Sequence, residues 1–172
     1  MTGKGSLNHN SRKFHAKNTD PNRTHWNVEY CNENIKDVYH ELFDEALKRY
    51  NDKQTRKDRK IDDYYEKIRS GKQEKLFHEV ILQIGDKDNM GSETMEGQLA
   101  AKILDEYMKG FQERNPTLRV FAAHLHLDEA TPHLHIDFIP YVTGSKRGLD
   151  TRVSLKQALS SLGFKGGSRS ET

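Results

Sequence analysis

The sequence of 172 residues contains little cysteine and few apolar residues. Its one cysteine, Cys31, excludes a disulfide within the chain and agrees with a reducing compartment. Only 33% of the residues are hydrophobic, and no apolar run approaches the roughly 20 residues that span a membrane. The N-terminus, MTGKGSLNHN, lacks the apolar stretch of a signal peptide. We therefore expect a cytoplasmic protein without membrane contact.

The chain also has little excess charge of either sign, because its net charge is only +2. The composition as a whole therefore does not predict a nucleic-acid partner. The charge is uneven, however, since residues 48–75 contain eleven Lys or Arg and six Asp or Glu. Such a segment could contact DNA phosphates, and a solvated helix face would explain it equally well. The candidate contacts to the DNA backbone are Arg23, Arg56, Lys57, Arg59 and Lys60.

Apolar residues at helical spacing predict helices over residues 35–51, 55–70, 92–114 and 154–163. The third helix would begin at a Ser92 cap, and the fourth would begin at Ser154 and stop at Gly163. In the third helix, apolar residues spaced by four are expected to face inward: Met95, Leu99, Ile103, Tyr107 and Phe111.

Runs rich in Val, Ile, Leu and Phe predict strands over residues 26–30, 76–86, 117–128 and 132–142. The polar residues 1–25 are expected to form an arm. Because strands and helices do not alternate strictly, we predict an α+β fold with an antiparallel sheet. We expect one domain over residues 1–165 and a linker-like tail over residues 166–172.

Four of the nine histidines stand in the stretch HLHLDEATPHLHIDF, residues 124–138. Side chains alternate between the two faces of a strand, so His133 and His135 share one face. His124 and His126 likewise share a face of the preceding strand. The leucines and isoleucines between them can face the core. The predicted hairpin therefore gathers imidazoles on one face of the sheet.

His126, His133 and His135 are predicted to converge on one metal ion. Neighbours on one strand face lie roughly 7 Å apart, which suits metal–nitrogen bonds of about 2.1 Å. Three imidazoles leave positions open for substrate, and by softness they suit Mn, Zn, Co or Ni better than Mg. His124 could be a ligand, contact a ligand or be exposed. Asp128 could hydrogen-bond a ligand imidazole.

The stretch HLDEATPHLH resembles the H-x-D-E-x-x-P-H-x-H motif of the Mob/Pre (MobV) plasmid relaxases, which belong to the HUH endonucleases. HNSR, residues 9–12, resembles their H-N-x-R motif, and THWNVEY, residues 24–30, resembles the following segment. The resemblance implies a bacterial enzyme with a ferredoxin- or RRM-like antiparallel sheet flanked by helices. Because the sequence stops at SRSET, it also implies a catalytic domain alone.

The implied enzyme, a DNA relaxase, cuts one DNA strand at an origin of transfer and stays joined to the 5′ phosphate. It later rejoins the ends, and so initiates mobilisation of a plasmid or integrative element. The resemblance implies that His9 is the nucleophile and that Glu129 accepts a proton or orients His9. Asn10 and Arg12 place His9 or the scissile phosphate. The metal is Mn²⁺ or Mg²⁺, with Zn²⁺, Co²⁺ or Ni²⁺ as substitutes in vitro, and its ligands are His126, His133 and His135.

The resemblance also implies the partners. The DNA is a single strand beside a hairpin, with Asn10 and Asn27 joining the basic residues as contacts. A coupling protein would bind through a C-terminal region that this sequence lacks. We expect this chain to be a monomer.

Other functions stay open on the sequence alone. A rolling-circle replication initiator or transposase of the same superfamily would use a tyrosine nucleophile. A metal-dependent phosphodiesterase would cut without a covalent intermediate, and a DNA-binding module would hold a structural metal without cutting. The rival nucleophiles are Tyr30, Tyr39, Tyr64 and Tyr65.

Overall fold

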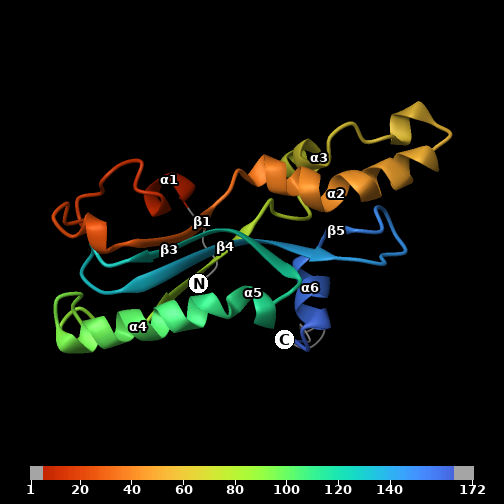
Figure 1. Ribbon diagram of the computed structural model, residues 1–172. Coiled ribbons are helices and arrows are strands. Elements are labelled where there is room, and N and C mark those ends of the chain that lie inside the picture. Colours follow the sequence, from red (N-terminus) through yellow and green to blue (C-terminus); the bar gives the residue numbers. More distant parts are fainter. Residues whose placement is uncertain (1–5, 165–172) are drawn as a thin grey trace. The chain divides into compact units, whose positions relative to one another are not determined.

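The computed structural model describes residues 6–164 and contains a five-stranded antiparallel sheet with flanking helices (Figure 1). Four strands adjoin in the order β1 (Val28–Asn32), β3 (Leu118–His126), β4 (His133–Val142) and β2 (His78–Gln83). A short fifth strand, β5 (Arg152–Val153), pairs with β4. The predicted α+β class with an antiparallel sheet is confirmed. The predicted tail, residues 166–172, lies outside the described residues.

The helices fall before, between and after these strands. Among residues 6–164, none of them is both long and apolar enough to cross a membrane. Short 3₁₀ turns cover Thr24–Trp26 and Lys57–Arg59. The α-helices are α1 (Leu7–Asn10), α2 (Ile35–Asp52), α3 (Tyr64–Ser70), α4 (Met95–Lys109), α5 (Phe111–Arg114) and α6 (Leu155–Ser161).

The chain divides into two compact units. The first contains the residues up to Asn32 together with His78–Arg114 and Val120–Phe138. The second contains Glu33–Phe77, Asn115–Arg119 and the residues from Ile139 onward. The histidine-rich strands 124–126 and 133–135 therefore lie in the first unit, and the basic segment 48–75 lies in the second. The extent predicted for the catalytic domain, residues 1–165, stays a prediction.

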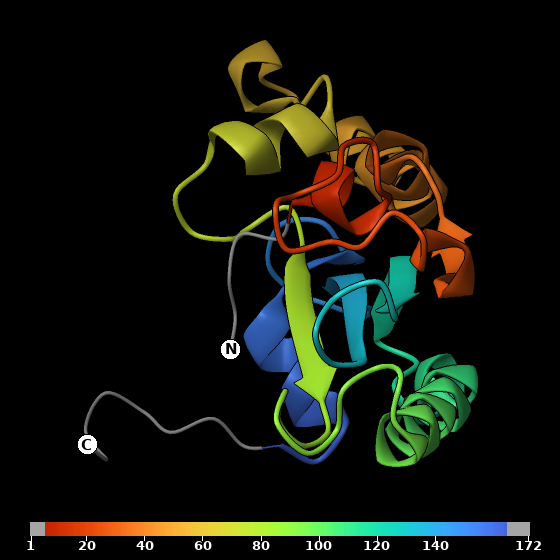
Figure 2. The same cartoon turned by 90° about the vertical axis from the view of Figure 1, so that its left-hand side faces the viewer.

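In the first unit, the sheet separates an apolar face from a polar one. Leu125, Leu134 and Ile136 are buried on the face along which α4 runs, whereas α1 lies over the opposite face (Figure 1). His126 faces α1, because its Nε2 donates to the backbone oxygen of Asn10 at 2.8 Å. Strand β2, the yellow-green arrow in Figure 2, forms one edge of the sheet and β1 forms the other.

The inward face predicted for the 92–114 helix is wrong. Of the five predicted residues only Phe111 is buried, and Met95 is 86% exposed. The buried face consists mainly of small or flexible side chains, which let the helix approach the sheet closely: Gly97, Ala100, Ala101, Leu104 and Met108. The helix also begins later, at a Thr94 cap, and is divided into α4 and α5 at Gly110. The bulky stripe therefore faces outward: Met95, Leu99, Ile103 and Tyr107.

In the second unit, α2 packs against α3 through aromatic rings. The centroid of Phe43 lies 5.2 Å from that of Tyr39 and 4.9 Å from that of Tyr64. The predicted helix over 55–70 is too long, because α3 begins only after its cap at Asp63. Before it, the side-chain amide of Asn51 both donates to and accepts from the backbone of Ile61, and so fixes non-helical chain. The basic run at residues 56–60 therefore lies in a loop with one 3₁₀ turn.

Candidate metal and catalytic site

The imidazoles of His126, His133 and His135 lie together on the polar face of the sheet. Their ring centroids are 4.9 Å (126–135), 5.0 Å (133–135) and 5.2 Å (126–133) apart. One nitrogen of each ring lies within 4.8 Å of those of the other two, so the three side chains could hold one metal ion. Strand β3 supplies the first and β4 the other two, as the alternation of side chains predicts.

In each of the three rings, one nitrogen donates a hydrogen bond to an oxygen outside the cluster. His135 Nδ1 lies 2.7 Å from Glu79 Oε1, and His133 Nδ1 lies 2.9 Å from the backbone oxygen of Thr131. His126 Nε2 lies 2.8 Å from the backbone oxygen of Asn10. Because these oxygens only accept, each of these nitrogens carries the hydrogen. The lone pairs therefore stand on His126 Nδ1, His133 Nε2 and His135 Nε2.

These lone pairs fit a divalent cation. Among the described residues, His126 Nδ1 and His135 Nε2 are buried without a hydrogen-bond partner. His133 Nε2 lies 3.8 Å from Glu129 Oε1, which is too far for a hydrogen bond. Buried polar atoms without a partner are costly, and metal-bound histidines commonly donate their other nitrogen to a carboxylate or carbonyl. The three residues thus have the donor set and the outer contacts of a metal site.

Burial favours the neutral form of two of these imidazoles, His126 and His133. It lowers the pKa of His126 to about 2, and it also lowers the pKa of His133. Only a neutral imidazole has a lone pair to give to a metal, so these two rings are prepared for coordination without first losing a proton.

Glu79, which the sequence did not suggest, supports the cluster from the edge strand. It lies opposite Asp137 in the pairing of β2 with β4, and Asn10 Nδ2 donates to both carboxylates, at 2.8 and 3.1 Å. Burial acts to raise the pKa of Glu79, but the hydrogen bonds from His135 and Asn10 outweigh it and lower the pKa. Burial and the nearby Glu79 raise the pKa of Asp137 to about 7.

The position of Asn10 corrects its predicted role as a DNA contact. Its side chain is only 2% exposed, and its amide is used by Glu79 and Asp137. A side chain so enclosed joins α1 to the sheet and cannot reach DNA.

The Glu79→Gln variant is expected to bind Mn²⁺ about 10- to 100-fold more weakly than the wild type. The amide is neutral and no longer strengthens His135 as a donor to the metal. Isothermal titration calorimetry measures the affinity. Glu29→Gln is the matched control, because Glu29 contacts His124 at 3.2 Å and none of the three clustered rings. Equal affinities for the two variants would contradict the role of Glu79.

His9 lies beside the imidazole cluster. Its ring centroid is 5.9 Å from that of His126 and 6.3 Å from that of His135. Its Nε2 lies 3.3 Å from Glu129 Oε1 and 3.2 Å from an Arg12 guanidinium nitrogen. Although Glu129 stands 120 positions after His9 in the sequence, the structure brings the three predicted catalytic residues, His9, Arg12 and Glu129, together.

Arg12 holds this group in place. Its guanidinium donates to Asp128 at 2.9 and 2.5 Å and to Glu129 at 2.9 Å. Its backbone has a φ of +50°, a left-handed conformation that costs a non-glycine residue about 1 kcal/mol or more. The ion pairs offset this cost, so the turn after α1 is fixed by the acids that Arg12 contacts.

Asp128 binds Arg12 and not a ligand imidazole, which corrects the prediction. It also accepts from Thr24 Oγ1 at 3.2 Å. Burial acts to raise its pKa, but the hydrogen bonds from Arg12 outweigh this effect and lower the pKa to about 2. A guanidinium is always charged and matches a carboxylate with two donors, so it is the stronger partner.

The turn that carries Glu129 is anchored on both sides. Ser92 Oγ donates to the backbone oxygen of Glu129 at 3.0 Å. Asn27 Oδ1 accepts from the backbone of Leu127 at 2.7 Å, and Arg23 donates to the Leu127 oxygen at 3.2 Å. In this structure the Asn27 side-chain oxygen and the Arg23 guanidinium hold the turn. Their contacts to DNA stay a prediction.

His124 stands apart from the three clustered rings. It is buried, its Nε2 lies 3.2 Å from Glu29 Oε2, and its ring centroid is 6.2 Å from that of His126. It is not among the described side chains whose nitrogens converge on a shared point. It therefore packs beside the site and contacts a carboxylate on β1.

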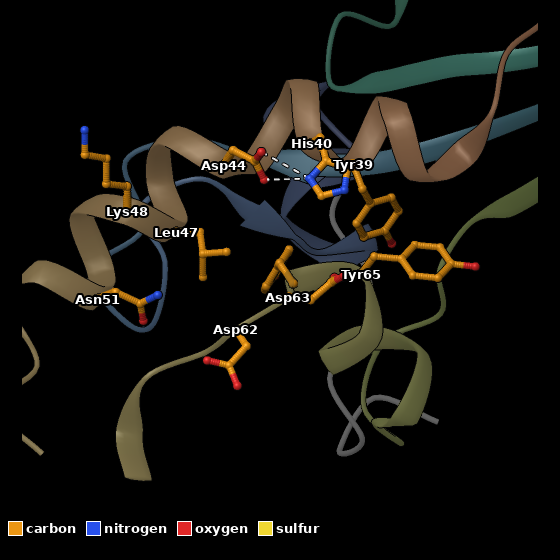
Figure 3. A pocket seen from close by; sticks show the side chains of 10 residues that line it. Tyr39, His40, Asp44, Leu47, Lys48, Asn51, Asp62, Asp63 and Tyr65 are labelled. Carbon is orange, nitrogen blue, oxygen red and sulfur yellow. Dashed lines mark hydrogen bonds and ion pairs between the residues drawn. The ribbon is translucent and has the colours of Figure 1, made fainter. Parts of the chain in front are cut away.

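The rival tyrosines have other contacts. Tyr30 donates to Asp105 of α4, on the apolar side of the sheet, and burial raises its pKa. In the second unit, Tyr39, Tyr64 and Tyr65 line a pocket of about 330 Å³ together with the His40–Asp44 pair (Figure 3). The Tyr39 hydroxyl donates to the Leu76 oxygen, and burial raises its pKa. The Tyr64 hydroxyl accepts from the backbone of Val153.

The remaining predicted DNA contacts are exposed in the second unit. Arg56 forms an ion pair with Asp58 at 2.6 Å. These four residues stay available for phosphate contacts: Arg56, Lys57, Arg59 and Lys60.

Several contacts that shape the site were not predicted. Glu79 orients His135, Thr131 accepts from His133, Asn18 donates to Glu129 Oε2 at 2.7 Å, and Ser92 holds the turn. The one signal in the sequence is Glu79 itself, an acid inside the predicted strand LFHEVILQIGD.

The chain is similar to known proteins along most of its length. Residues 4–163 match the family described as plasmid recombination enzyme (Mob/Pre). A crystal structure of the MobM relaxase domain, bound to 22 nucleotides of plasmid pMV158 oriT DNA and to Mn at pH 5.5, is 27% identical, with a TM-score of 0.52. The similarity covers 88% of this chain and 67% of that one.

A second structure of that domain with oriT DNA and Mn, at pH 4.6, is 23% identical over the same shares, 88% and 67%, with a TM-score of 0.46. No curated protein matches the chain.

Proposed function

Since the chain belongs to the Mob/Pre family of plasmid recombination enzymes and is a DNA relaxase, we propose that it nicks one strand at an origin of transfer through a covalent bond between His9 and the 5′ phosphate. The observation that carries the proposal is the position of His9, whose ring lies 5.9 Å from that of His126 in the metal-competent cluster. The later rejoining of the ends would initiate mobilisation of a plasmid or integrative element.

The proposed cofactor is a divalent cation, Mn²⁺ or Mg²⁺, held by His126, His133 and His135. When bound, it supplies positive charge at the scissile phosphate. The related MobM relaxase domain was crystallised with Mn. In this chain, Glu79, Thr131 and the Asn10 backbone orient the three rings.

The proposed reaction is a transfer of the phosphoryl group to His9. A nitrogen of His9 bonds phosphorus, and the bond from phosphorus to the 3′ oxygen of the preceding nucleotide breaks. That oxygen leaves as a hydroxyl after it takes up a proton from water. Glu129 offsets the positive charge that the imidazole gains, and Arg12 holds Glu129 in place.

Rejoining is the reverse reaction. A 3′ hydroxyl returns its proton to the solvent as its oxygen bonds the phosphorus, the bond from phosphorus to nitrogen breaks, and His9 leaves as a neutral imidazole. The phosphoramidate keeps much of the free energy of the original ester, so no external energy source is needed. Simple hydrolysis would lose that free energy and leave the strand cut.

DNA binding is proposed to involve a single strand beside a hairpin. The exposed basic residues of the second unit would contact phosphates, and affinity would fall steeply with salt. The monomeric state and the coupling-protein partner stay predictions. The residues proposed for phosphate contact are Arg56, Lys57, Arg59 and Lys60.

The proposal is tested with a pool of labelled single-stranded 50-mers of random sequence, incubated with the protein and Mn²⁺. We expect a covalent protein–DNA adduct on a denaturing gel, and sequencing of its DNA gives the preferred site. A clean cut without adduct would support a phosphodiesterase, and uncut DNA that is only retained under native conditions would support a binding module. Either result would refute the proposed reaction.

An adduct alone does not name the nucleophile. A phosphoramidate is labile in acid, whereas a phosphotyrosine is stable there. An acid-stable adduct would therefore favour the initiator or transposase alternative with a tyrosine nucleophile.

A further inference from the structure

Two large apolar side chains are exposed beside the proposed site. Phe14 follows the HNSR segment and is 50% exposed, and its ring centroid lies 6.0 Å from that of His9, tilted by 51°. Ile81 of the edge strand β2 is 40% exposed. It lies opposite His135 in the register of β2 with β4, so both side chains project from the same face of the sheet. Neither side chain is needed to fill the core.

The chemistry of the surroundings makes these two side chains unusual. The site is otherwise built from imidazoles, carboxylates, amides and a guanidinium. Such groups suit contacts to a phosphate, to a metal ion or to one another. An exposed phenyl ring can offer only its face and edge to a ligand. Nucleobases are the flat, apolar-faced part of a DNA strand, and each base stacks on an aromatic ring with little regard to its identity.

We propose that Phe14 is a stacking platform that positions the unpaired nucleobase next to the phosphate attacked by His9. This inference rests on the proposed nicking function and adds the group that holds the strand there. Ile81 contributes a smaller apolar contact to a neighbouring base. Because a phenyl ring has no hydrogen-bonding atom, this platform fixes the strand without selecting its sequence. Sequence selection must come from other contacts.

The platform acts on the strand and not on the metal. Phe14 contacts the ring of His9 but none of the three clustered imidazoles. Removing the Phe14 ring should therefore leave the affinity for Mn²⁺ unchanged and lower the affinity for a strand that carries bases. Stacking of one base is worth about 1–3 kcal/mol, which corresponds to a change in affinity of roughly 5- to 150-fold.

The chain offers a matched control for an exposed aromatic residue. Trp26 is 37% exposed in the same unit, and its ring contacts His25 at 5.9 Å. A general loss of exposed aromatic surface would affect the Trp26→Ala variant as well. The Phe14→Tyr variant keeps a ring and Phe14→Leu keeps only apolar volume, so together they separate stacking from simple hydrophobic contact.

The experiment measures the affinity of the full chain with Mn²⁺ for the strand dT12 and for the same backbone without bases, by fluorescence anisotropy. We expect Phe14→Ala and Phe14→Leu to bind dT12 about 10-fold more weakly than wild type. Phe14→Tyr and Trp26→Ala should stay within about twofold. The base-free strand should bind wild type and Phe14→Ala equally. Equal dT12 affinities for wild type and Phe14→Ala, or equal losses on both strands, would overturn the platform.

A cross-link locates the contact independently. A dT12 strand with one 5-iododeoxyuridine is irradiated with the protein, and the modified peptide is identified by mass spectrometry. Attachment at Phe14 supports the platform, and attachment only elsewhere overturns it. Failure of the nicking proposal looks different, because the wild type would then form no adduct with any strand of the random pool.

Discussion

The His9→Ala variant is expected to form no covalent adduct with DNA, while it binds Mn²⁺ as tightly as the wild type. His9 lies beside the imidazole cluster, with its Nε2 3.3 Å from Glu129 Oε1. The hydroxyls of Tyr30, Tyr39 and Tyr64 form their hydrogen bonds elsewhere. Loss of an enzymatic nucleophile commonly lowers the rate by about 10³-fold or more. Single-turnover cleavage on a denaturing gel measures the loss, and calorimetry measures the metal.

The matched control for this variant is His15→Ala. His15 is an exposed histidine of the same arm, six residues further along the chain. It should retain full adduct formation. An adduct that persists at the wild-type rate in His9→Ala would contradict the assignment, and the Tyr64→Phe and Tyr65→Phe variants would then identify a tyrosine.

Replacement of His133 by alanine is expected to abolish tight Mn²⁺ binding and, with it, nicking. His133 Nε2 is one of three lone pairs that converge within 4.8 Å, and two imidazoles alone hold a divalent ion weakly. The loss of affinity should exceed the roughly 100-fold limit for outer contacts such as Glu79. Calorimetry gives the affinity, and the denaturing gel gives the activity at saturating Mn²⁺.

His124→Ala serves as the matched control for the metal. His124 is a buried histidine on β3, two residues from His126, but it contacts Glu29 and lies outside the cluster. It should keep Mn²⁺ affinity within a few-fold of wild type. If His124→Ala lost the metal and His133→Ala kept it, the assignment of the three ligands would be wrong.

The imidazole cluster was predictable from the sequence because strand alternation is a local rule. His126, His133 and His135 follow a period of two on both sides of a short turn, so their shared face follows from the strands alone. His9 was different, since a histidine in a polar arm has no period. Only the resemblance of HNSR to a family motif placed it at the site.

Other parts of the site depend on contacts between distant segments. The position of Glu79 beside His135 is set by the pairing of β2 with β4, and no local pattern gives that register. Asn10 and Asn27 were expected to contact DNA because they stand in segments that resemble the family motifs, and Arg23 because it is basic. In the folded chain, they hydrogen-bond the strand and turn that carry the site.

The two wrong helix predictions have separate physical reasons. In α4 the bulky residues spaced by four form a stripe, but small residues such as Ala100 and Ala101 pack closer to the sheet and take the buried face. In the 55–70 segment, the apolar residues at helical spacing led to a predicted start at residue 55, whereas α3 begins only at Tyr64. The side chain of Asn51 fixes the backbone of Ile61 in a non-helical form, and Asp63 caps the helix.

The most direct test of the site is anomalous diffraction at the manganese edge, from crystals of the chain grown with Mn²⁺. The proposed site predicts one strong peak enclosed by His126 Nδ1, His133 Nε2 and His135 Nε2, with His9 beside it. A peak at other side chains, or no peak among these three nitrogens at saturating Mn²⁺, would contradict the account.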